Sequence, residues 1–200
     1  MKDRILVPAV LAVLMTGVVG CKVKVNKSAD GGSDNVKIAT PFGGIDVNQD
    51  RTSAADLGLP AYPGAVQQND GDGGKSAKVD MGFGSFRMRV RVVHYGSQDS
   101  RDQVMAFYRK ALTQYGNVIE CADGKPVGTP SVTWEGLTCD ASGHDHTPAR
   151  VDAGEIQLKA GSSRHQHIVA FSNKTGLPTD FTMIALDLPH GFEPEQKGTN

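Results

Sequence analysis

The clearest alternation of apolar and polar positions in this chain lies between residues 86 and 92. Apolar side chains occupy one face there and arginines the other: Phe86, Met88, Val90 and Val92 against Arg87, Arg89 and Arg91. Since successive side chains of a strand point to opposite faces, this pattern predicts a strand. The arginines would lie about 7 Å apart and form a basic stripe. Such a stripe suits an anionic partner such as a polysaccharide or a lipid phosphate, although a solvated sheet face balanced by acidic neighbours is the alternative.

Residues 100–115 carry the pattern of an amphipathic helix. Ser100 and Gln103 form a capping box, in which each side chain satisfies a backbone group of the first turn. The apolar positions recur with helical spacing: Val104, Phe107, Tyr108, Ala111, Leu112 and Tyr115. This spacing produces one apolar stripe that needs a sheet or another helix to cover it.

The remaining alternating segments predict strands, as does Val79–Met81 before the turn at residues 82–85. Those after the helix are residues 118–121, 132–139, 156–160, 165–172 and 181–188. The sequence therefore predicts an α+β domain, residues 36–188, with an antiparallel sheet of about five to seven strands packed on one main helix, residues 100–115. A small hairpin at residues 36–48 either packs on this domain or stands apart from it.

A short segment after this hairpin resembles one found in uncharacterised exported bacterial proteins. Pro60-Ala-Tyr62-Pro63-Gly64-Ala65 precedes a strand and then a helix that contains Phe107-Tyr108. In the proteins that it resembles, no activity is attached to this segment, so the resemblance implies export and not a function.

The first 21 residues combine a basic start with a short apolar run. Lys2 and Arg4 precede residues 5–19, which are almost wholly apolar, and Cys21 follows Val18-Val19-Gly20. The run is shorter than the roughly 20 residues of a membrane-spanning helix and has the order of a secretory signal. Its end resembles the lipobox of bacterial lipoproteins, in which the cysteine is acylated, with palmitate for example, and becomes the new N-terminus. An uncleaved anchor helix and a plain secretory peptide are the alternatives.

This resemblance and the composition of the remaining chain together predict four parts. Residues 1–20 are a signal peptide, residues 21–35 are a lipidated tether, and residues 36–188 are the domain. Residues 189–200 are a disordered tail. The protein would then be held in the cell envelope by its lipid. Lys22, standing where an Asp favours the inner membrane in the better-known sorting rule, favours the periplasmic side of the outer membrane.

Three cysteines fit an exported protein. With Cys21 acylated, Cys121 and Cys139 remain as an even pair in an oxidising compartment, and we expect a disulfide between them. A redox or metal pair is the alternative, but the two do not have the spacing of a C-x-x-C motif.

Composition adds little about partners. A formal net charge of −1 gives no argument for nucleic acid. Neither a nucleophile elbow nor paired carboxylates in an apolar setting occur, so no catalytic residue is predicted.

Two His-x-His pairs are the best candidates for chemistry. On a strand His165 and His167 would point to the same face, and His144 and His146 lie in a polar loop that could approach them. Imidazole favours zinc or copper among the common metals.

From the lipobox and the lack of catalytic motifs we expect a lipid-anchored envelope protein with a non-catalytic binding or structural role, which binds an envelope protein or an anionic envelope ligand. A metal-binding or metal-dependent hydrolytic protein is the alternative.

Overall fold

The computed structural model of this chain describes residues 22–26, 35–49, 51–69, 74–139, 155–172 and 177–189. These residues form eleven strands, one α-helix and two short 3-10 helices. The strands are β1 (Lys22–Asn26), β2 (Asn35–Thr40), β3 (Gly43–Gln49), β4 (Val66–Gln67), β5 (Ser76–Phe83), β6 (Phe86–Ser97), β7 (Ile119–Ala122), β8 (Lys125–Pro126), β9 (Ile156–Gly161), β10 (His165–Ser172) and β11 (Thr179–Asp187). The helices are η1 (Ala54–Leu57), α1 (Arg101–Leu112) and η2 (Thr113–Tyr115).

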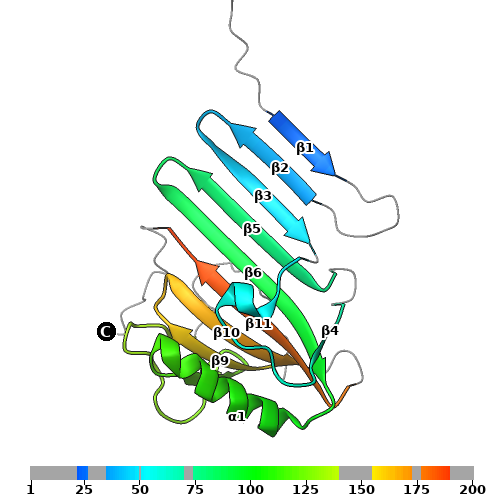
Figure 1. The fold of residues 1–200 in the computed structure, drawn as a ribbon. Helices are drawn as coiled ribbons and strands as arrows, with labels where there is room; N and C mark the ends of the chain where they lie inside the picture. Colours follow the sequence, from blue (N-terminus) through cyan, green and yellow to red (C-terminus); the bar gives the residue numbers. More distant parts are fainter. Residues whose placement is uncertain are drawn as a thin grey trace, which may run out of the picture.

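All eleven strands belong to a single antiparallel sheet. Its order is β1-β2-β3-β5-β6-β11-β10-β9-β7-β8, and the two-residue strand β4 pairs with the far end of β6. In Figure 1 the helix α1 lies beside β9 and β10, whereas β1, β2, β3 and β5 extend away from it on the other side of β6. We call these four strands the extension.

The predicted fold class is wrong in the size of the sheet and in what supports it. The sheet has eleven strands and not five to seven, and α1 packs on the half that holds β9, β10 and β11, away from the extension. The reason is that the hairpin of residues 36–48 does not stand apart. Its second strand pairs with β5 along the whole of Gly43–Gln49, and β1 adds a further strand to its first.

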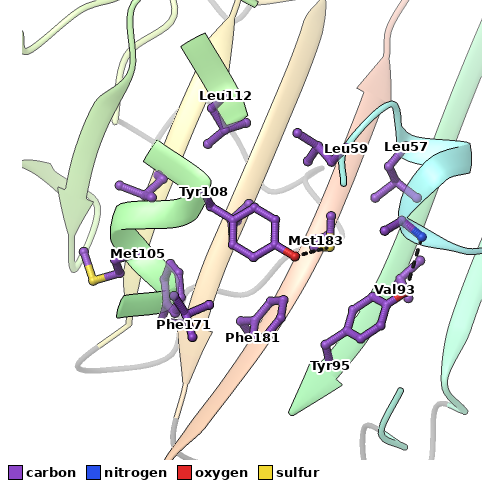
Figure 2. Packing of buried hydrophobic residues seen from close by; sticks show 14 of the residues in the cluster. Leu57, Leu59, Val93, Tyr95, Met105, Tyr108, Leu112, Phe171, Phe181 and Met183 are labelled. Carbon is purple, nitrogen blue, oxygen red and sulfur yellow. Dashed lines mark hydrogen bonds between the residues drawn. The ribbon is translucent and has the colours of Figure 1, made fainter. Parts of the chain in front are cut away.

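The helix forms where the sequence predicts it, and it begins with the predicted cap. The Ser100 amide and hydroxyl both donate to Oε1 of Gln103, at 3.1 and 2.8 Å. The apolar stripe of α1 then packs on the sheet, with Val104, Tyr108 and Leu112 fully buried. Figure 2 shows Tyr108 directed from the helix towards Phe181 and Met183 of β11. The ring centroids of Tyr108 and Phe181 are 5.3 Å apart.

The segment between β3 and β4, residues 51–65, completes this core. Leu57 and Leu59, in and after η1, are buried beside Val93 and Tyr95 of β6 (Figure 2). Tyr62 follows, and its ring meets that of Phe107 edge to face at 5.1 Å. The Pro-Ala-Tyr-Pro-Gly-Ala segment therefore has a structural use: it closes the side of the core that α1 leaves open.

The two faces of the sheet differ along β6. Val93 and Tyr95 lie in the core under α1, on the same face as the arginines that precede them. Val90 and Val92 point to the opposite face and pack on a second, smaller cluster formed by Ile168, Ile184 and Leu186. The face that the sequence predicts to be solvated is thus continuous with the face that the helix covers.

The predicted disulfide is present. Cys121 of β7 is bonded to Cys139, with their Cα atoms 5.5 Å apart, and both residues are buried against Ile119. The segment that ends at Cys139 is not the predicted strand of residues 132–139. It makes only isolated bridges, Val132 with Thr138 and Gly136 with Ser162, and it leaves Trp134 84% exposed.

The predicted tether is in part a strand, because Lys22–Asn26 pair with Asn35–Ala39 as β1. Residues 27–34 and the predicted signal peptide, residues 1–20, lie outside the described residues, as does the predicted tail 189–200 except for Pro189. Within the described residues, no helix has the length and apolar character that crossing a membrane requires.

Candidate functional site

The three predicted arginines lie in one row on β6, but their surroundings differ. Arg89 donates through Nε to Asp80 of β5 at 3.2 Å, and Arg91 lies 3.8 Å from Asp187 of β11. Arg87 is exposed, and it forms no ion pair with another described residue. Two of the three positive charges are therefore balanced by carboxylates of neighbouring strands.

These ion pairs belong to a row of charges that crosses the helix-free half of the sheet. Lys37 of β2 lies 3.3 Å from Asp46 of β3, and the Asp80–Arg89 pair follows on the next two strands. Cross-strand opposite charges stabilise a sheet face that is open to water. Each of these two pairs joins neighbouring strands, β2 to β3 and β5 to β6, on a part of this face that no helix of the described residues covers.

The row ends at a histidine of β10. Nδ1 of His165 lies 3.0 Å from Asp187, whose second oxygen faces Arg91. His165 is 62% exposed. Asp187 is thus shared between a permanent cation and a residue that is charged only when protonated.

His167 lies on the same face of β10 but in a different environment. Its ring stacks on that of Tyr115, with centroids 3.5 Å apart and planes 7° from parallel. Tyr115 donates through its hydroxyl to the Gly58 carbonyl at 2.7 Å. Burial lowers the pKa of His167 below its ordinary value, and the nearby Asp187 opposes this shift. Nδ1 of His167 is buried and has no hydrogen-bond partner among the described residues.

Gly58 makes the stacking of Tyr115 and His167 possible. It ends η1 in the left-handed conformation, with φ of 72°, and a Cβ at this position would lie 2.2 Å from the Tyr115 hydroxyl oxygen. Any other residue would therefore push Tyr115 away from both Gly58 and His167.

A groove of about 380 Å³ opens to solvent beside this stacked pair. Its lining includes Gln114, Tyr115 and Glu135 in addition to the two histidines. The polar groups that line it are already engaged in part: Gln114 donates to two carbonyls, and His165 faces Asp187.

The structure brings together only one of the two predicted His-x-His pairs. His165 and His167 share a face of β10, whereas His144 and His146 lie outside the described residues. Among the residues that are described, no three histidine, cysteine, aspartate or glutamate side chains are grouped as metal ligands. Cys21, the predicted acylation site, also lies outside the described residues.

The sequence analysis missed a group of exposed aromatic residues. Phe42 is 83% exposed, Phe83 is 42% exposed and Phe86 is 39% exposed. Each lies in or beside a hairpin turn, which is Pro41-Phe42 between β2 and β3 and Gly84-Ser85 between β5 and β6. Apolar aromatic residues within such turns were the signal that could have identified them.

The comparisons with known proteins define no class for this fold or this site. The chain matches no protein-family model, no curated protein sequence and no solved structure. A function must therefore be argued from the residues themselves.

Proposed function

We propose that this chain is a lipid-anchored protein of the cell envelope with a non-catalytic binding or structural role. The observation that carries the proposal is the distribution of its three cysteines. Cys121 and Cys139 are cross-linked, and Cys21 stands alone at the end of the basic-then-apolar N-terminal run. A structural disulfide is typical of an oxidising compartment, which is where an acylated chain would be delivered.

Most of the polar side chains at the candidate site already contact other residues of the fold, and this supports a non-catalytic role. His165 faces Asp187, Tyr115 donates to a backbone carbonyl, and two of the three arginines face carboxylates. Each of these contacts connects neighbouring segments of the fold. They stabilise the domain, and they reduce the number of free groups that could act on a substrate.

Intact-mass measurement of the protein from its native host tests the anchor. The expected mass is that of a chain beginning at Cys21 and carrying fatty acyl groups. Cys21→Ser should abolish acylation and leave the N-terminal segment attached, because the acyl chains need the thiol. The matched control is the Cys121→Ser/Cys139→Ser double variant, which should remain acylated. A wild-type chain that retains Met1 and has no acyl mass would overturn the proposal.

A metal-binding role is the second candidate, and one observation favours it. His165 and His167 lie on the same face of β10, and Nδ1 of His167 has no hydrogen-bond partner among the described residues. Titration calorimetry with Zn²⁺ and Cu²⁺ on the mature chain tests this role. Heat at micromolar metal that disappears in His165→Gln/His167→Gln would support it, and the absence of heat in the wild-type chain would refute it.

A further inference from the structure

The exposed phenylalanines lie on neighbouring hairpin turns at one end of the sheet. Phe83 and Phe86 flank the β5–β6 turn and face each other in the register of the two strands. Phe42 lies in the β2–β3 turn, and its carbonyl accepts a hydrogen bond from the Gly84 amide at 3.3 Å. We call Phe42, Phe83 and Phe86 the aromatic tip.

The first described strand starts at this same end. Lys22, the first residue of β1, pairs with Ala39, and Ala39 pairs with Gly44. The next row of paired residues, one position closer to the turns, consists of Thr40, Gly43, Phe83 and Phe86. Figure 1 shows the start of β1 and the two turns along one edge of the extension, with α1 at the opposite end of the molecule. Cys21 is one peptide bond from Lys22, so an acyl anchor on Cys21 would enter the sheet beside the aromatic tip.

A basic residue stands next to the tip. Arg87 follows Phe86 directly and is exposed, and it is the only one of the three arginines without a carboxylate partner among the described residues. A guanidinium group binds phosphate strongly, and a long side chain can place its charge at the level of lipid head groups while its stem covers apolar surface.

We propose that the aromatic tip inserts into the surface of the phospholipid bilayer that holds the anchor, with Arg87 at the head-group phosphates. The inference rests on the proposed acylation of Cys21 and adds the orientation of the domain. Apolar aromatic side chains bury their surface at the boundary between head groups and acyl chains. With the tip inserted, β6 runs away from the bilayer, and its 12 residues place the far end of the strand about 40 Å from the membrane.

Quenching of a single tryptophan by brominated lipids tests the insertion. The full lipidated chain is reconstituted into vesicles of phosphatidylethanolamine and phosphatidylglycerol with brominated or ordinary acyl chains. Trp134→Phe first removes the native tryptophan, which is 84% exposed. Phe42→Trp then reports on the tip. Its emission should lose most of its intensity in the brominated vesicles, because bromine quenches only at short range.

The matched control is Val66→Trp in the same background. Val66 is 56% exposed and pairs with Gly96 at the opposite end of β6, so its emission should be the same in both kinds of vesicle. In a second reporter, Phe86→Trp, adding Phe42→Glu should reduce the quenching, whereas adding Val66→Glu should not.

The outcomes separate this inference from the proposed anchor. Acylated chains whose Phe42→Trp emission is equal in both kinds of vesicle would overturn the insertion and leave the anchor standing. Chains without acyl mass would overturn both. Emission that is blue-shifted, insensitive to bromine and lost on dilution would show a second copy of the chain covering the tip, and this also overturns the insertion.

Discussion

Tyr108 is the residue on which the core converges. Its hydroxyl accepts a hydrogen bond from the Tyr62 amide at 3.1 Å and lies 3.4 Å from the Met183 sulfur, to which it donates. Burial raises the pKa of Tyr108 well above its ordinary value. One hydroxyl thus connects the helix, β11 and the segment that closes the core.

We expect Tyr108→Phe to lower the free energy of unfolding by about 1–2 kcal/mol, because the Tyr62 amide would lose its acceptor in a half-buried position. Urea unfolding measures this loss. Tyr62→Phe is the control, since it removes only an exposed hydroxyl that donates to Asp99. An equal loss in the two variants would contradict the role given to the Tyr108 hydroxyl.

His167 makes the stability of the domain depend on pH. Because burial lowers its pKa, the folded chain binds a proton less readily than the unfolded chain, whose histidine has the ordinary value of 6.5. The contribution of neutral His167 is therefore complete above this value and is lost as the pH falls through the lower, folded pKa.

We expect the melting temperature to fall between about pH 7 and pH 5, and to fall less in His167→Phe, which keeps the stacking on Tyr115 but cannot be protonated. Thermal unfolding followed by circular dichroism at several pH values measures this difference. His165→Gln is the control on the same strand. An identical pH dependence in the wild type and in His167→Phe would refute the assignment.

At the scale of elements, the helix and the strands with long alternation were predictable, because local spacing defines them. β5, β6 and the hairpin of β2 and β3 follow the alternation of Val79–Met81, Phe86–Val92 and residues 36–48. The joining of that hairpin to β5 was not predictable, since it depends on pairing between residues distant in the chain. β1 was missed although Lys22–Asn26 alternate polar and apolar residues, because together with the polar segment that follows them they have the composition of a tether.

The same distinction applies to the sites. Cys121 and Cys139 could be paired because only one partner remained for each once Cys21 was set aside. The three phenylalanines could be noticed one by one, but their grouping into the aromatic tip could not be predicted, since Phe42 and Phe83 lie 41 positions apart and come together only through the β3–β5 pairing. The ion-pair partners of Arg89 and Arg91 were hidden for the same reason.

The cap of α1 gives a prediction that belongs to this scale. Ser100→Ala should lower the free energy of unfolding by about 1 kcal/mol, because the first turn of the helix loses its side-chain partner. Denaturant unfolding checks this value. Ser85→Ala, in the exposed β5–β6 turn, is the control and should change stability by no more than about 0.5 kcal/mol. Equal effects would show that the cap contributes nothing specific.

At the scale of the whole molecule, the disulfide fastens the edge of the sheet that lies opposite the extension. It closes a loop with a sequence separation of 18 residues and holds the segment before Cys139 against β7. Cys121 and Cys139 form a small buried cluster with Ile119, apart from the main core that the helix covers. The cross-link therefore replaces part of the packing that a larger core would supply.

We expect Cys121→Ala/Cys139→Ala to lower the free energy of unfolding by about 3 kcal/mol, as the loop length predicts. Chemical denaturation with and without a reducing agent measures this change. Reduction should destabilise the wild-type chain by a similar amount and leave the double variant unaffected. A wild-type chain that is insensitive to reduction would contradict a stabilising role for the bond.

The strand β6 belongs to both halves of the molecule. Its alternation therefore decides at once which residues of the extension and which residues of the core lie on each face of the sheet. Deleting one residue at Val92 would exchange the faces of everything before it relative to Val93 and Tyr95. The charged row would then share a face with the small apolar cluster, and the valines would meet the ion pairs. Many residues of the extension can thus be substituted, whereas an insertion or deletion between Arg87 and Val93 would conflict with the packing of the core.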